Sequence, residues 1–269
     1  MNSFVKHIFN LYIFLNIHVA LSVVSLYFIF NQNNFHKEYA LFLFFSTVFS
    51  YGLIRIMFLK NNRSQFLFYY YRYSYIFKGI LFFSFLCSLF FFMKLPIQVR
   101  FSIVPLGLIT LLYQSYFPFF SFRQNGIIKI ITVSFVWAML TVVIPGIFFS
   151  ANSTSFRLEF LFVFLYILLL TLSFDQRDIL IDDKALKTFP QAYPEYKSYF
   201  YLILGSVLSV LLFFIFDGFE RFLSEIILLI SLFLCWFSDE NKKFYYTTFL
   251  IEGIPVLWAL VLFLQKKGF

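Results

Sequence analysis

Long hydrophobic segments recur along the chain and are separated by short polar breaks. One of them, LYIFLNIHVALSVVSLYFIF, has the length of about 20 residues that an α-helix needs to cross the hydrocarbon core of a membrane. Reading apolar runs between polar breaks predicts about nine transmembrane helices, at 11–30, 39–59, 74–93, 101–118, 127–149, 156–174, 199–216, 222–237 and 246–264. The eighth is the weakest, because Glu225 falls in its first turns. We therefore expect an all-α, polytopic membrane helical bundle that forms one domain over residues 1–269.

The Lys and Arg residues of the polar breaks predict the orientation of this bundle. Twelve of them lie at the N-terminus or in breaks that follow even-numbered spans, and seven lie on the opposite side. Cytoplasmic loops carry the excess of Lys and Arg in multi-pass proteins. We therefore expect a cytoplasmic N-terminus and an external C-terminus in the cell membrane, with the breaks after spans two and six on the same side.

The composition agrees with a membrane protein. The chain is 61% hydrophobic and 13% charged, with a mean hydropathy of +0.85, whereas a soluble domain is about half apolar and about a quarter charged. The net charge of +8 is spread over the polar breaks, which argues against nucleic acid as a partner. Cys87 and Cys235 lie inside apolar runs, so we expect neither a disulfide nor a cysteine metal site. The first apolar run is too long for a cleavable signal peptide.

One short segment, FDQRDILIDD, holds four of the thirteen acidic residues: Asp175, Asp178, Asp182 and Asp183. If the sixth predicted helix continues through this segment, the first three carboxylates project from one face, within about 60° of each other. Like charges that close destabilise a helix unless a cation lies among them. An alternative interpretation is an acidic helix end that is simply solvated.

A divalent cation is the candidate partner for this acidic face. Mg²⁺ prefers carboxylate oxygens and usually takes waters or phosphate oxygens as further ligands. Asp175, Asp178 and Asp182 are therefore candidate magnesium ligands. Arg177 and Lys184 stand beside them as candidate substrate-binding residues for a magnesium-bound diphosphate.

The string DQRDILIDDKALKTFP, at 175–190, resembles the second aspartate-rich motif of the UbiA-type intramembrane prenyltransferase superfamily. In that family an Asp is followed after three residues by another Asp, and then by a basic stretch that ends in Lys-Thr-hydrophobic-Pro. Asp178 and Asp182 match the two aspartates, and 187–190 matches the tail. Further segments are similar to the family's fourth, fifth and last spans: LLYQSYFPF at 111–119, GIIKIITVSFVWAMLTVVIP at 126–145 and IEG at 251–253.

The resemblance covers most of the chain and implies a UbiA-like integral membrane prenyltransferase. Such a protein transfers a prenyl group from a polyprenyl diphosphate to an acceptor within the bilayer and depends on Mg²⁺. Metal and basic side chains stabilise the departing diphosphate. On this resemblance the candidate catalytic residues are Asp178, Asp182 and Lys187, together with Arg55. The expected partners are a polyprenyl diphosphate or another lipid, and the membrane.

The chain departs from the family where a first acidic motif is expected, at the end of span two. The corresponding stretch, FSYGLIRIMFLKNNRSQ, holds no carboxylate, and Arg55 stands about where the first aspartate would be. The guanidinium could grip the diphosphate in place of a metal. It could instead pair with Asp178 or Asp182 and close an empty site. The alternative function is therefore a non-catalytic UbiA-fold membrane protein that binds a lipid or a partner.

Two further polar residues are candidate substrate-binding residues. His18 lies in the first predicted span, and polar groups in spans usually face the bundle interior. It either satisfies packing polarity or lines the acceptor pocket. Tyr113 either faces the cavity near the diphosphate or has a role at a helix end. A transporter is a third interpretation, but the sequence has no convincing pair of Gly- or Pro-broken spans in two symmetric halves.

Overall fold

The computed structural model describes residues 3–57, 64–113, 125–149, 156–180, 187–239, 241–242 and 244–267. The described chain consists of helices joined by short connections and contains no strand in these ranges, which confirms the all-α class. The helices are α1 (Ser3–Phe14), α2 (Ile17–Phe30), α3 (Lys37–Met57), α4 (Ser64–Arg72), α5 (Ser74–Lys94), α6 (Ile97–Tyr113), α7 (Gly126–Ala138), α8 (Ile144–Phe148), α9 (Phe156–Arg177), α10 (Phe189–Ala192), α11 (Lys197–Ile215), α12 (Gly218–Trp236) and α13 (Ile254–Lys266).

Four shorter segments complete the described structure. Two are 3-10 turns, η1 (Gln32–Asn34) and η6 (Pro194–Tyr196). Two are π-helical, η4 (Met139–Val143) between α7 and α8, and η7 (Tyr246–Ile251) before α13. Isolated π-helical turns are rare and often occur where a helix must accommodate packing or a functional group.

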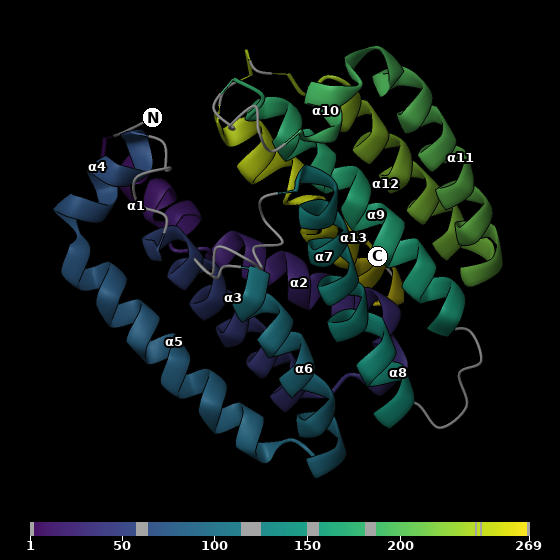
Figure 1. Ribbon diagram of the computed structural model, residues 1–269. Coiled ribbons are helices and arrows are strands. Elements are labelled where there is room, and N and C mark those ends of the chain that lie inside the picture. Colours follow the sequence, from purple (N-terminus) through teal and green to yellow (C-terminus); the bar gives the residue numbers. More distant parts are fainter. Residues whose placement is uncertain are drawn as a thin grey trace.

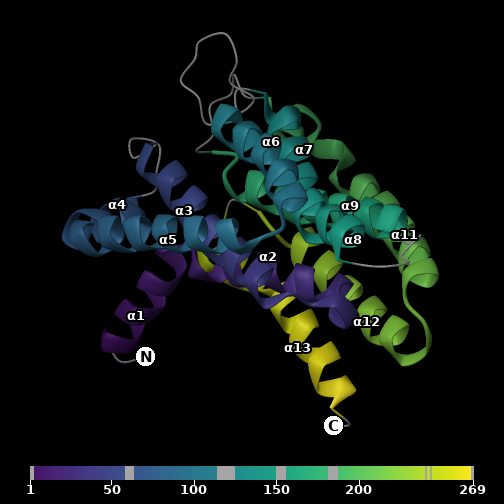
Figure 2. The same cartoon turned by 90° about the horizontal axis from the view of Figure 1, so that it is seen from below.

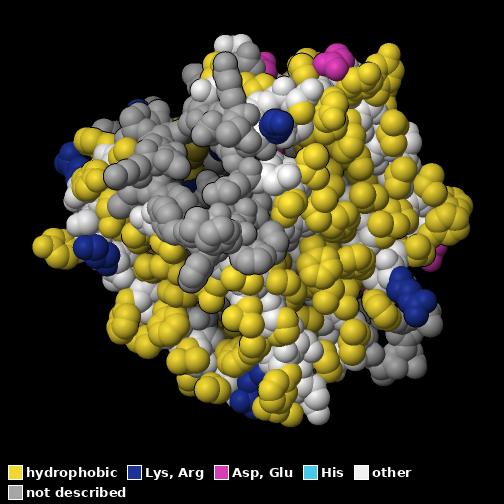
Figure 3. Space-filling view, viewed as in Figure 1, with side chains coloured by type: hydrophobic (Ala, Val, Ile, Leu, Met, Phe, Trp, Pro, Cys, Tyr) yellow, Lys and Arg dark blue, Asp and Glu magenta, His cyan; other side chains and the backbone are white. Residues whose placement is uncertain are grey.

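Six helical segments are long and apolar enough to cross a membrane, or seven if the bent pair α1–α2 forms one span. Each range expected to span contains a helix, but α6 has only 17 residues, and α12 carries Glu220, Arg221 and Glu225. The structure therefore supports six to seven spans by length and composition, and the expected number of about nine is not confirmed. Hydrophobic side chains cover most of the described part of the face in Figure 3, as expected of a protein surrounded by lipid. The chain is a multi-pass membrane protein, and its orientation stays a prediction.

The helices pack into two groups that meet at α2. In one group α9 contacts α7, α11 and α12, and in the other α3 packs against α5 (Figure 1). Helix α2 joins them, because it contacts both α3 and α13. Figure 2 shows α1 and α13 extending from the same side of the bundle. The larger core lies around α9 and α13, where Tyr166 and Trp258 are fully buried.

Two of these helical segments are interrupted, and side chains from other elements satisfy the interrupted backbone. Helices α1 and α2 meet at an angle of 60°, with Asn16 in the left-handed conformation at φ 62°. The second interruption lies between η7 and α13, where Gly253 has no room for a side chain: a Cβ atom would lie 2.5 Å from the Phe249 carbonyl oxygen and 2.9 Å from Nε2 of His18. Inside a membrane such irregular backbone persists only where protein groups bond its polar atoms.

Candidate functional site

The predicted magnesium ligand Asp175 lies in the last turn of α9, and its side chain is only 1% exposed. Lys129 of α7 places its Nζ 2.6 Å from Oδ1 of this carboxylate. The first turn of α7 is fixed by Asn125, whose side chain accepts hydrogen bonds from the N–H groups of Ile127 and Ile128. The ion pair therefore joins the C-terminal end of α9 to the N-terminal end of α7.

The second predicted ligand, Asp178, follows the end of α9. The neighbouring Arg177 donates to both of its carboxylate oxygens, from Nε at 2.9 Å and from Nη2 at 2.5 Å. Arg177 also donates from Nη1 to Oγ1 of Thr247 at 2.7 Å, and its guanidinium lies over the rings of Phe174 and Phe244. The predicted substrate-binding residue Arg177 is thus 8% exposed and directed into the protein.

Asp175 and Asp178 do not share one acidic helix face, which was the expectation for a helix that continues through this segment. Helix α9 ends at Arg177, and residues 178–180 form a turn, so Asp175 and Asp178 are engaged by different cations. Among the described residues no group of three His, Cys, Asp or Glu side chains could hold a metal ion. Each of the two described aspartates of the motif thus has a cationic side chain as a partner. Asp182, Asp183 and Lys184 lie outside the described residues, and magnesium binding stays a prediction.

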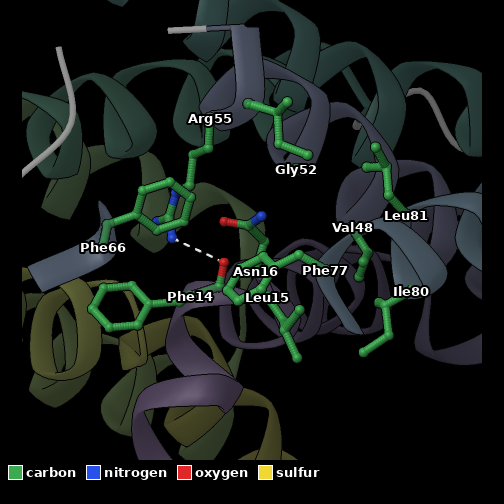
Figure 4. A pocket seen from close by; sticks show the side chains of 11 residues that line it. Phe14, Leu15, Asn16, Val48, Gly52, Arg55, Phe66, Phe77, Ile80 and Leu81 are labelled. Atoms are coloured by element: carbon green, nitrogen blue, oxygen red, sulfur yellow. Dashed lines mark hydrogen bonds between the residues drawn. The ribbon is translucent and has the colours of Figure 1, made fainter. Parts of the chain in front are cut away.

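Arg55 has a role that the sequence interpretation did not include. Its Nη1 donates to the carbonyl oxygens of Phe14, at 3.2 Å, and Ile13, at 3.4 Å, just before the break between α1 and α2. Figure 4 shows the guanidinium over the ring of Phe66, whose centroid is 5.5 Å away. The space around it is small, about 10 Å³. Arg55 thus bonds backbone carbonyls at the break, and its charge also interacts with that of Glu252.

His18 is placed between the two interrupted segments. Its Nδ1 lies 2.7 Å from the hydroxyl of Tyr12, and its Nε2 lies 2.9 Å from the carbonyl oxygen of Phe249. Its ring stacks on that of Phe249 at a centroid distance of 5.0 Å. Both ring nitrogens are therefore used within the protein, which favours the packing interpretation over a pocket-lining one.

The Lys-Thr-Phe-Pro tail of the motif forms the start of α10. Lys187 is exposed and has φ 47°, and the N–H of Thr188 donates to Oε1 of Gln191 at 3.1 Å. The side chain of Gln191 also reaches back to the carbonyl oxygen of Ile179 at 3.4 Å. The tail thus has a local structural use, as a helix start held against the end of α9.

A largely apolar cavity of about 430 Å³ lies between α3, α6 and α7. Tyr113 and Met57, the last residues of α6 and α3, belong to its wall. Thr132 lines it from α7, one turn beyond Lys129, so the cavity approaches the polar end that holds the Lys129–Asp175 pair. Polar groups in its wall include Trp137, whose indole N–H donates to the Tyr51 hydroxyl at 3.2 Å.

The sequence left Tyr113 open between a cavity position and a role at a helix end, and the structure gives it both, as the last residue of α6 and part of the cavity wall. The sequence did not identify Lys129 or Thr247 as members of the site. The available signal for Lys129 was a cation in the first turn of an otherwise apolar span, which is a costly place for a charge without a partner. Thr247 had no comparable signal, because a threonine in an apolar span commonly bonds its own helix.

The chain was compared with known protein families, curated proteins and solved structures, and none of them matches it.

Proposed function

We propose that this protein binds a single-chain amphiphilic lipid of the polyprenyl diphosphate type, with the hydrocarbon chain in the cavity between α3, α6 and α7. The cavity is the observation that carries the proposal. Ligand cavities are mostly apolar and carry a few polar groups that fix the orientation of the ligand. Here the apolar wall surrounds most of the space, while Tyr113 and the Tyr51–Trp137 pair provide polar atoms.

The volume sets the length of the hydrocarbon chain. An apolar cavity of about 150 Å³ takes up one benzene molecule, which has six carbon atoms. The cavity of about 430 Å³ is roughly three times as large, so it accommodates about 15 to 20 carbon atoms, or three to four isoprene units. Each buried methylene contributes about 0.8 kcal/mol, so affinity rises with chain length until the cavity is full.

Prenyl transfer from the bound diphosphate is the second candidate function. The likeness of Asp178, Asp182 and the 187–190 tail to the UbiA-type motif favours it. The ion pairs of Asp175 and Asp178 with Lys129 and Arg177 favour the binding function, because they occupy the carboxylates that a metal would need. We therefore assign no metal-dependent step to these residues.

Binding of a series of prenyl diphosphates to the purified protein in lipid nanodiscs tests the proposal. We expect saturable binding that is strongest at about 15 to 20 carbons and persists in a metal chelator. Formation of a prenylated acceptor only when Mg²⁺ is added would establish the second candidate. Absence of saturable binding at every chain length would contradict both.

A cavity-filling variant links the binding to the cavity. Gly107 lines the cavity, and a Cβ atom added there meets no atom within 4 Å. Gly107→Phe should therefore weaken binding and shift the optimum to shorter chains, without a steric conflict at the backbone. Gly79→Phe is the matched control, because Gly79 also has open space around it and lies outside the cavity, on α5. Equal binding by both variants would exclude this cavity as the site.

A further inference from the structure

We propose that Lys129 binds the anionic head group of the lipid and that Asp175 competes with the head group for it. This inference rests on the proposed function and deepens it. Lys129 would then determine the specificity for an anionic head group, and it would leave Asp175 when the ligand binds.

The position of Lys129 on α7 supports the assignment. Lys129 precedes Thr132, Val133 and Val136 by three, four and seven residues, and all three line the cavity. Residues at these spacings share one face of a helix. The lysine therefore stands at the N-terminal end of the cavity-lining face of α7, where the head group of a lipid whose chain fills the cavity would lie.

The two partners of the ion pair differ in exposure, and this difference allows Lys129 to exchange the Asp175 carboxylate for a phosphate group. Asp175 is 1% exposed, whereas the side chain of Lys129 is 22% exposed. An ammonium group on a flexible four-carbon stem turns readily from one oxygen ligand to another. Lys129 can thus reach a phosphate oxygen at the cavity end by rotation of its side chain, while Asp175 stays in place.

Arg177 is less suited to such an exchange. Its guanidinium makes two bonds to Asp178 and one to Thr247, and it lies between the rings of Phe174 and Phe244. All these contacts fix the planar group in one orientation. Of the two cations that bond Asp175 and Asp178, Lys129 has the more exposed side chain, at 22% against 8% for Arg177.

Competition predicts opposite effects for the two partners. Lys129→Gln removes the cation, so an anionic head group should bind more weakly, by about tenfold, as expected for the loss of one charged hydrogen bond. Asp175→Asn removes the competitor and leaves the lysine, so the same head group should bind more tightly. Neither change should alter the binding of a neutral lipid with the same hydrocarbon chain.

The test measures the affinities of the full-length protein, in phosphatidylcholine nanodiscs, for a 15-carbon prenyl diphosphate and for the 15-carbon prenyl alcohol. The preference for the diphosphate should fall in Lys129→Gln, rise in Asp175→Asn and persist in Lys129→Arg. Lys197→Gln is the matched control, because Lys197 donates to the carbonyl oxygen of Ser238 at 2.8 Å and belongs to α11, which contributes no residue to the cavity wall. Its preference should equal that of the wild type.

The outcomes separate the exchange from the cavity proposal. If the wild type binds both probes and Lys129→Gln keeps the same preference, the exchange is overturned and the cavity proposal stands. A weaker preference for the diphosphate in Asp175→Asn also overturns the exchange, because a purely structural ion pair would give that result. If the wild type binds neither probe, the cavity proposal fails and the exchange falls with it.

Discussion

Replacing Arg55 by methionine distinguishes a structural role of this residue from a substrate-binding one. Methionine keeps most of the length and apolar volume of the side chain but cannot donate a hydrogen bond. In the wild type the guanidinium donates to the carbonyl oxygens of Phe14 and Ile13 and lies over the ring of Phe66. Arg55→Met leaves both carbonyls without this donor, at the break between α1 and α2.

The magnitude is worked from three of the contacts that Arg55 makes, the two hydrogen bonds and the contact with the Phe66 ring. A hydrogen bond to a charged group contributes about 1.5–3 kcal/mol, and a cation–π contact contributes about 0.5–2 kcal/mol. The bond to Ile13 is long, at 3.4 Å, and counts for less than the bond to Phe14 at 3.2 Å. Removing the charge also removes its desolvation cost. We therefore expect a net loss of about 2–3 kcal/mol in the free energy of unfolding.

Unfolding by sodium dodecyl sulfate in mixed micelles, followed by the fluorescence of the three tryptophans, measures this loss. Arg157→Met is the control, because Arg157 is exposed in the first turn of α9, and a substitution at an exposed position changes the stability by only about 0.5 kcal/mol. Unchanged stability of Arg55→Met, together with lost binding of a prenyl diphosphate, would refute the structural role. That result would favour the sequence interpretation, in which Arg55 grips the diphosphate.

Further predictions concern the second interruption and the start of α10. Gly253→Ala should lower the free energy of unfolding by about 1–3 kcal/mol, because the added Cβ atom meets the Phe249 carbonyl and His18. Gly79→Ala should not lower it, because Gly79 has open space around it, and detergent unfolding of the two variants measures the difference. His18→Phe keeps an aromatic ring but removes the hydrogen bonds of the imidazole to the Tyr12 hydroxyl and the Phe249 carbonyl, so the free energy of unfolding should fall by about 1–3 kcal/mol. The affinity for a prenyl diphosphate, measured in nanodiscs, should stay unchanged, and lost affinity at full stability would favour the pocket-lining interpretation. Gln191→Ala should free α10 from α9 and speed limited proteolysis between 178 and 196, and an unchanged cleavage rate would contradict this.

The sequence predicted the helices well because they depend on local composition. The sixth predicted span, 156–174, lies within α9, and the fifth, 127–149, covers α7, η4 and α8. The first predicted span was expected as one helix, but it breaks at Asn16. Asparagine adopts the left-handed conformation more readily than most residues, yet this tolerance does not reveal that a break is present.

The site was harder to predict, because its contacts join distant parts of the chain. Lys129 and Asp175 are 46 residues apart, and no periodicity relates them. Neighbours such as Arg177 and Asp178 do not face each other within a helix, so their bidentate contact depends on α9 ending between them. Glu225 was the reason that the eighth predicted span had the weakest sequence evidence. In the structure its carboxylate accepts a hydrogen bond from the Ser209 hydroxyl at 3.0 Å.

The most direct test of the central claim is photo-crosslinking of a 15-carbon prenyl diphosphate that carries a photoreactive group near the end of its chain. The account predicts labelled peptides from α3, α6, α7 and η4, at or beside cavity residues such as Leu106 and Leu140. This labelling should be lost when unlabelled ligand is added in excess. Labelling confined to lipid-facing helices such as α5 and α11, or labelling that excess ligand does not reduce, would contradict it.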